Sequence, residues 1–194
     1  MATKLNMNKT VRLTMAAILT AVVIVFQFLG AFIKFGPFSV SLVLLPIVIG
    51  AAMCGWKTST WLGFIFGVVV LMSGDAAAFM TINAFGTVAT VLVKGAAAGL
   101  AAGLVFEAAR KINKYLAVVL SALVCPVVNT GIFLIGCKLF FFEAVSEWGL
   151  AGGFDSTFSY MILGLVGVNF LFELATNIVL SPVAVRILNI KINN

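Results

Sequence analysis

Long apolar stretches, separated by short polar segments, constrain this chain more than any other feature of its sequence. A helix needs about 20 apolar residues to cross the ~30 Å hydrocarbon core of a bilayer. Six stretches reach or approach that length: 11–33, 40–54, 60–73, 85–106, 116–140 and 158–187. Only 9% of the 194 residues are charged, whereas a soluble domain averages about 25%. We therefore expect an all-α membrane protein, a compact bundle of six transmembrane helices that forms one domain over residues 1–194.

The distribution of basic residues predicts how the helices are oriented. If the N-terminus is cytoplasmic, the cytoplasmic segments hold Lys4, Lys9, Arg12, Lys57, Arg110, Lys111, Lys114, Arg186 and Lys191. The opposite segments hold only Lys34 and Lys138, together with the acidic residues Asp75, Glu143, Glu147 and Asp155. The positive-inside rule then places both termini in the cytoplasm. Topology also accounts for the net charge of +6, so we do not expect nucleic acid as a partner.

The parts that most enzymes need are missing from this sequence. There is no histidine, which removes the commonest general base and a common metal ligand. The three cysteines, Cys54, Cys125 and Cys137, lack metal-ligand spacing and lie in or at the ends of apolar stretches. We expect no enzymatic activity, no cofactor and no metal site. Because we find no nucleotide-binding motif, we expect an ion gradient or a partner protein to supply energy.

Small residues four positions apart mark three of the apolar stretches. They are Ala17 and Ala21 in the first, Gly63 and Gly67 in the third, and Gly95, Gly99 and Gly103 in the fourth. In lipid, close backbone approach through small residues is a main source of helix association. For the glycines we favour packing within the bundle. The alanine pair lies beside the basic N-terminal segment, where either internal packing or the docking of a partner subunit explains it.

Two charged residues lie near the middle of the predicted membrane spans. Lys94 is about ten residues into the fourth stretch, and Glu173 is about fifteen residues into the sixth, both counted from the outer end. A charge at this depth costs at least ~2.5–3.5 kcal/mol on insertion scales, and such residues usually serve function. The two side chains are therefore candidates for an ion pair, for a binding site, or for both.

Other polar residues lie at similar depth in the last three stretches. Helical spacing places Thr87 and Thr90 on one face with Lys94, with Asn83 further outward. Asn169 lies four residues before Glu173, and Asn129 follows Pro126 in the fifth stretch. One interpretation is that these groups only bridge helices. We favour a small-molecule cavity, because the hydrogen-bonding capacity exceeds what one ion pair consumes.

Three segments resemble the substrate-binding S components of energy-coupling factor (ECF) vitamin transporters, in the branch that includes the riboflavin and pantothenate types. They are TMAAILTA, FGPFSVSLVLLPIVIGAAMCGWKTSTWLGFIFGVVV and SGDAAAFMTINAFGTVATVLVKGAAAGLAAGL. Where the family usually ends its second helix with glycine-proline, this chain has Gly55-Trp56-Lys57. The resemblance extends over nearly the whole chain and implies six helices with both termini cytoplasmic, in the plasma membrane of a bacterium.

The resemblance also implies a mechanism and roles for particular residues. An S component binds a vitamin from outside, docks onto a membrane coupling subunit that carries two ATPases, and topples to release the vitamin inward. Ala17 and Ala21 would form the docking surface, and Phe35, Phe38 and Phe79 would belong to lid loops. The substrate site would comprise Lys94, Asn129, Asn169, Glu173, Asn83, Thr87, Thr90 and Asp75.

The chemistry of the predicted site favours one vitamin over the others. The Lys94 ammonium suits a carboxylate, and asparagines suit hydroxyl and amide groups, so pantothenate fits best. Riboflavin or another B vitamin is the next choice. The alternative function is a stand-alone secondary transporter of a small metabolite, in which Glu173 couples to an ion gradient, although the halves of the chain show no clear repeat.

Overall fold

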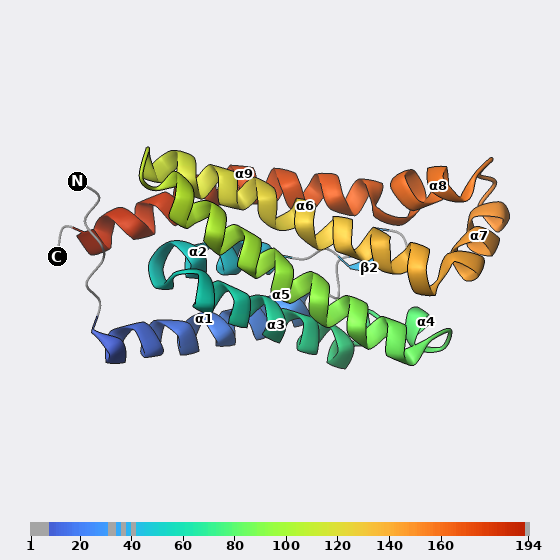
Figure 1. Ribbon diagram of the computed structural model, residues 1–194, viewed down its shortest axis with the longest axis horizontal. Coiled ribbons are helices and arrows are strands. Elements are labelled where there is room, and N and C mark those ends of the chain that lie inside the picture. The colour runs from blue at the N-terminus through green and yellow to red at the C-terminus, as the bar shows by residue number, and fades with distance from the viewer. Residues whose placement is uncertain (1–7, 31–33, 36–37, 40–41, 193–194) are drawn as a thin grey trace.

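The protein is almost entirely helical in the computed structural model, which describes residues 8–30, 34–35, 38–39 and 42–192 (Figure 1). The long helices lie side by side along one axis, and α1 begins at the same end of the bundle at which α9 finishes. The elements are α1 (Lys9–Gly30), β1 (Lys34–Phe35), β2 (Phe38–Ser39), α2 (Leu44–Cys54), α3 (Trp56–Ser73), α4 (Ala77–Met80), α5 (Ala84–Ala109), α6 (Lys114–Phe140), α7 (Phe142–Ala151), α8 (Thr157–Ser159), the π-helical segment η1 (Tyr160–Gly167) and α9 (Val168–Ile192). The two short strands pair antiparallel, with Lys34 opposite Ser39.

Five helical segments in the described part of the chain are long and apolar enough to cross a membrane. They are α1, α3, α5, α6 and the continuous run Thr157–Arg186 through α8, η1 and α9. The sixth apolar helix, α2, has only 11 residues, which at 1.5 Å per residue spans about half of the hydrocarbon core. Nine of those residues are buried, so neighbouring helices rather than lipid surround this short segment. These apolar helices indicate a membrane protein.

Glycines bring α3 and α5 into backbone contact. A Cβ atom on Gly63 would overlap the carbonyl group of Gly95, and a Cβ on Gly95 would overlap the carbonyl oxygen of Gly63. Gly99 and Gly103 face Ser59 and Trp56 of α3 in the same manner. The prediction that these glycines serve packing within the bundle is confirmed, because any side chain would force the two helices apart.

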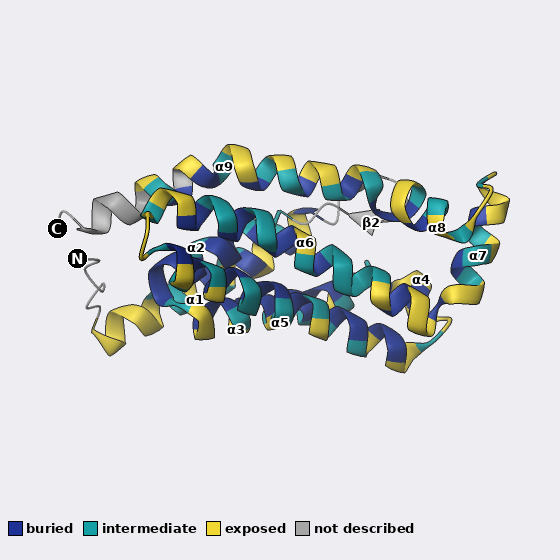
Figure 2. Cartoon of the chain, turned by 45° about the horizontal axis from the view of Figure 1, so that its top comes forward, coloured by how far each residue is buried: buried dark blue, intermediate teal, exposed yellow. Residues whose placement is uncertain are grey.

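The buried side chains form two clusters along the bundle. The larger one joins α1, α2, α3, α5, α6 and α9 around Phe66, Leu44, Ile47 and Leu62, all fully buried. The smaller one lies where α4, α6, α7 and η1 meet and contains Phe79, Phe141 and Leu165. Figure 2 shows that exposed residues cover the outer faces of the long helices, while buried residues face inward. The polar cavity described below lies between these clusters and takes lining residues from both.

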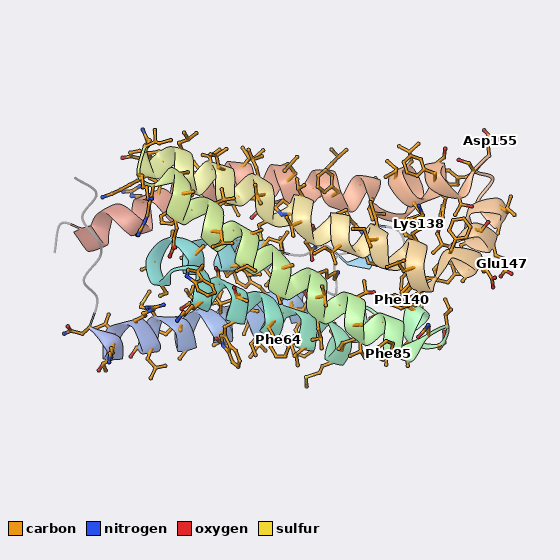
Figure 3. All side chains as sticks on the ribbon, in the orientation of Figure 1. Phe64, Phe85, Lys138, Phe140, Glu147 and Asp155 are labelled. Atoms are coloured by element: carbon orange, nitrogen blue, oxygen red, sulfur yellow. The ribbon has the colours of Figure 1, made fainter. Side chains whose placement is uncertain are left out.

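The sequence predicts no helix between its fifth and sixth apolar stretches, at residues 141–157, but the structure contains a further helix there. Helix α7 buries Val145 and Gly149 on one side and exposes Glu147 on the other. Glu147 and Asp155 point away from the bundle at its α7 end, beyond Lys138, Phe85 and Phe140 (Figure 3). Helix α7 has ten residues, which are too few to form a membrane span. A search for long apolar stretches therefore does not detect it.

Candidate binding cavity

A cavity of about 80 Å³ lies among α1, α3, α5, α6 and the η1–α9 segment, beneath α4. Eighteen residues from six segments line it: Gln27, Val70, Asp75, Ala76, Phe79, Thr87, Thr90, Val91, Lys94, Asn129, Thr130, Phe133, Phe141, Leu165, Val166, Asn169, Phe170 and Glu173. Charged, amide and hydroxyl groups line this cavity together with apolar walls. That composition is typical of a small-molecule site, in which few polar groups orient a ligand.

Seven of the eight residues predicted to bind substrate line this cavity. Helix α5 supplies three of them from one face, helix α6 supplies Asn129, and α9 supplies two. The three on α5 are Thr87, Thr90 and Lys94, those on α9 are Asn169 and Glu173, and the seventh is Asp75 in the α3–α4 turn. The structure thus brings together the polar groups of three separate helices, and their role in binding stays a prediction.

The eighth residue, Asn83, has a different place. Its side-chain oxygen accepts a hydrogen bond of 2.8 Å from the backbone N–H of Gly86, so it caps the N-terminus of α5. Asn83 is not among the residues that line the cavity. Helical spacing alone cannot distinguish an asparagine that caps the helix from one that binds a ligand, because both can lie in line with the same face of the helix.

Lys94 lies between two aromatic rings at the cavity wall. Its Nζ is 5.7 Å from the centre of the Phe66 ring and 5.2 Å from that of Phe133. Ring faces attract a cation at this range, most strongly where water is scarce. The rings come from α3 and α6, so they hold the ammonium in the cavity from two sides. An ammonium held in this manner offers a positive charge and up to three N–H donors to a ligand.

Gln27 of α1 is a cavity residue that the sequence analysis did not identify. Its Nε2 donates a hydrogen bond of 2.7 Å to Oδ2 of Asp75, which also accepts one of 3.3 Å from the Ser73 hydroxyl. Gln27 is 1% exposed, although it lies in one of the most apolar helices. The signal was present in the sequence, because a lone glutamine in a membrane span is rare for the same reason that a charge is.

Three buried polar atoms in the cavity wall have no hydrogen-bond partner within the described residues. They are Oε1 of Gln27, Oγ1 of Thr90 and Oδ1 of Asn129, and each belongs to a different helix. A buried polar atom left without a partner costs about 1–3 kcal/mol. Native proteins rarely keep several of them in one place without a reason. The three residues line the same cavity, and this favours a site for a polar ligand.

Aromatic side chains close the cavity at its α4 side. Phe79 is 3% exposed and packs edge-on against Phe133, Phe141 and Trp148, with ring centres 5.7, 4.8 and 5.4 Å away. Phe79 therefore lines the cavity and packs against Trp148 of helix α7, and its role as a lid stays a prediction. The side chains of the other two predicted lid residues, Phe35 and Phe38, lie outside the described residues.

The alanine pair predicted to dock a partner lies on the outer surface of α1. Ala17 and Ala21 are both exposed, and neither lines the cavity. Leu13, Ile24 and Phe28 are exposed on the same side of α1. The pair therefore does not serve packing within this bundle, and a surface for lipid or for a partner remains.

Comparison with known proteins gives one match. A family model described as "ECF transporter, substrate-specific component" matches residues 11–185, which is most of the chain. No curated protein and no solved structure matches the chain.

Proposed function

The chain belongs to the family of ECF transporter substrate-specific components, and from this premise we propose that it captures a water-soluble vitamin for import. Proteins of this family are transporter components rather than enzymes; they work with an ECF module and bind small-molecule substrates. We propose that the substrate of this chain binds in the cavity around Lys94. The ECF module in this proposal is a coupling membrane subunit with two ATPases, which supplies the energy that this chain cannot obtain by itself.

The observation that carries the proposal is the set of buried polar atoms that converge on one cavity. Gln27, Thr90 and Asn129 all line this cavity, and each has a buried side-chain oxygen without a hydrogen-bond partner among the described residues. A ligand with hydroxyl or amide N–H groups would satisfy these oxygens and remove the cost of their burial. If the protein had only a structural or pore-lining role, nothing would compensate for the free-energy cost of burying these oxygens.

Pantothenate is the vitamin whose chemistry fits these groups best. Its carboxylate would meet the Lys94 ammonium, and its hydroxyl and amide N–H groups would donate to the oxygens of Asn129 and Thr90. Phe66 and Phe133 flank Lys94, and this apolar setting strengthens a charge–charge contact. The flat ring system of riboflavin would instead need aromatic faces along the full length of the site.

Entry of a vitamin requires the cover of the cavity to move. The cavity holds about 80 Å³, whereas sites for drug-sized ligands hold roughly 300–1,000 Å³. Phe79 fills the space above the polar layer, and it lies on α4, a helix of only four residues between two turns. We propose that α4 and its turns swing outward to admit the vitamin and then close over it.

We propose that the protein crosses the plasma membrane of a bacterium six times, with both termini in the cytoplasm. The second crossing is then the predicted span 40–54, of which α2 reaches through about half of the hydrocarbon core. Lys9, Lys57 and Arg110 lie near one end of the bundle, at the start of α1, the start of α3 and the end of α5 (Figure 1). Glu147 and Asp155 lie at the other end (Figure 3). The positive-inside rule assigns the basic end to the cytoplasm, so the cover over the cavity faces outward.

We expect Ala17→Leu/Ala21→Leu to reduce pantothenate uptake by roughly tenfold or more, in cells that also produce the ECF module, because overpacking a close helix contact costs about 1–3 kcal/mol. Both alanines are exposed, so the purified variant should bind pantothenate as the unaltered protein does. The measurement is uptake of radiolabelled pantothenate, together with affinity of the purified variant. The control is Ala175→Leu, which enlarges an exposed alanine on α9 and should leave uptake unchanged.

Two results of that experiment would contradict the proposal. Uptake by the double variant at the unaltered rate would show that the alanine pair does not dock the module. Uptake by the unaltered protein in cells without the ECF module would identify a stand-alone transporter, and Glu173 would then be the residue to test for ion coupling.

A further inference from the structure

A second cavity, of about 270 Å³, lies where α1 begins, α2 turns into α3, and α5 ends. These three places lie at one end of the bundle, opposite α4 and α7 (Figure 1). The lining residues are Arg12, Ala51, Ala52, Met53, Cys54, Gly55, Trp56, Lys57, Phe106, Glu107 and Arg110. None of them lines the cavity around Lys94, so this is a separate place with a separate chemistry.

Three basic side chains from three helices line this second cavity. Arg12 lies in the first turn of α1, Lys57 in the first turn of α3, and Arg110 directly after the last turn of α5. Glu107 is the one acidic residue in the described lining. No carboxylate of the described residues lies within 4.0 Å of any of the three basic groups. The lining therefore carries more positive than negative charge, because Glu107 offsets only one of the three basic groups.

The shape of the cavity depends on Gly55, which joins α2 to α3. Its φ of 86° is a conformation that glycine adopts without strain. An added Cβ would lie 3.4 Å from Oε1 of Glu107 and 4.0 Å from Nη2 of Arg12. The side chains of α1 and α5 thus converge above the glycine, and the absence of a side chain there keeps the space between them open.

The rest of the lining is apolar and aromatic. Ala51, Ala52, Met53 and Phe106 are all buried and form apolar wall. Trp56 is 37% exposed, and Nζ of Lys57 lies 5.6 Å from the centre of its ring. Tryptophan at the end of a membrane span is typical of the lipid headgroup region. Cations beside apolar wall at this depth match a lipid headgroup and its glycerol rather than a free ion.

We propose that this cavity binds the phosphate of an anionic membrane lipid such as phosphatidylglycerol. Arginine donates paired N–H groups that fit phosphate oxygens, and lysine adds a third positive charge. A zwitterionic lipid would bring a choline cation into a site that already carries excess positive charge. The proposal does not depend on which vitamin the other cavity binds.

The test uses the purified full-length chain in a neutral detergent and follows its thermal unfolding. Three additives are compared: dioctanoyl phosphatidylglycerol, dioctanoyl phosphatidylcholine and inorganic phosphate. The variant Arg12→Gln/Lys57→Gln/Arg110→Gln removes the three charges of the cavity. The control Lys9→Gln/Lys111→Gln/Lys114→Gln removes three charges near the same end that do not line it.

We expect dioctanoyl phosphatidylglycerol to raise the unfolding temperature of the unaltered protein and of the control at similar concentrations. In the cavity variant the half-saturating concentration should rise on the order of 100-fold, since each basic residue near an anionic lipid contributes roughly fivefold. If the triple variant does not fold, Lys57→Gln alone should still show the roughly fivefold loss. Phosphatidylcholine and inorganic phosphate should have much weaker effects.

Four results would overturn the proposal. Equal stabilisation by phosphatidylcholine would remove the requirement for an anionic headgroup, and equal stabilisation by inorganic phosphate would indicate a soluble ligand. An equal loss of lipid affinity in the control variant would show that the overall charge at this end of the bundle, and not the cavity, attracts the lipid. Unchanged lipid affinity in the cavity variant, with loss of assembly with the ECF module, would identify the occupant as an acidic segment of a partner.

Discussion

Lys94→Met is expected to weaken pantothenate binding by roughly 30-fold or more, because removal of one partner from a buried charge pair costs about 2–5 kcal/mol. Methionine keeps most of the length of the lysine side chain, whose end lies between Phe66 and Phe133, so the change removes charge more than packing. The measurement is isothermal titration of the purified protein with pantothenate. Thermal unfolding without ligand should show that the variant remains folded.

A second ligand isolates the contribution of the carboxylate. The alcohol analogue of pantothenate, in which a hydroxymethyl group replaces the carboxylate, should bind the unaltered protein far more weakly than pantothenate does. Lys94→Met should bind the two ligands about equally. Lys111→Met, which changes an exposed lysine distant from the cavity, serves as the control. Preserved discrimination in Lys94→Met would show that another group recognises the carboxylate.

Gly99→Val is expected to destabilise the bundle by about 3 kcal/mol or more, because overpacking in a core costs about 1–3 kcal/mol even where flexible side chains give way. Here the obstacle is backbone: an added Cβ would lie 2.7 Å from the carbonyl carbon of Ser59 and 3.1 Å from Cα of Thr60. In a chain of this length that loss corresponds to a fall of about 6–12 °C in unfolding temperature. Tryptophan fluorescence of the purified protein during heating provides the measurement.

Gly131→Ala on α6 is the matched control, because no atom lies within 4 Å of the Cβ that it would add. Alanine also favours the helix over glycine by about 1 kcal/mol, so this variant should be at least as stable as the unaltered protein. Gly99→Ala should lie between the two. If Gly99→Val unfolded at the temperature of the unaltered protein, the close contact of α3 and α5 would not exist in the membrane.

The polar layer was predictable from the sequence because helical spacing is a local property. Thr87, Thr90 and Lys94 recur at three and four residues, which places them on one face, and the structure directs that face to the cavity. Asn169 and Glu173 follow the same rule on α9. Depth within each span then suffices to predict that groups from different helices lie in one layer.

The residues that sequence reasoning missed depend on contacts between distant segments. Gln27 lies 48 residues from its partner Asp75, and nothing local indicates that the two meet. Phe141 lines the cavity, and both Phe141 and Trp148 pack against Phe79, which lies more than 60 residues earlier in the chain. Asn83 shows the opposite error, because the sequence predicts it in the site although it does not line the cavity. Its side-chain oxygen instead accepts a hydrogen bond from the backbone of α5.

The sequence is also a limited guide to the number of membrane spans. The sequence predicts six spans of which the second covers residues 40–54, and the structure gives α2 only 11 residues there. Mean hydropathy cannot distinguish a helix that faces lipid from one that other helices enclose. Helix α2 packs against α1, α3, α5, α6 and α9, and this enclosure is not visible in the sequence.

The most direct test of the account is the identity of the small molecule that the purified protein retains. Protein produced in bacteria would be washed in detergent, denatured, and its released small molecules identified by mass spectrometry, beside Lys94→Met treated in the same manner. The account predicts one molecule of a carboxylate-bearing vitamin, pantothenate, per unaltered chain and almost none in the variant. A neutral or cationic molecule retained equally by both proteins would contradict it.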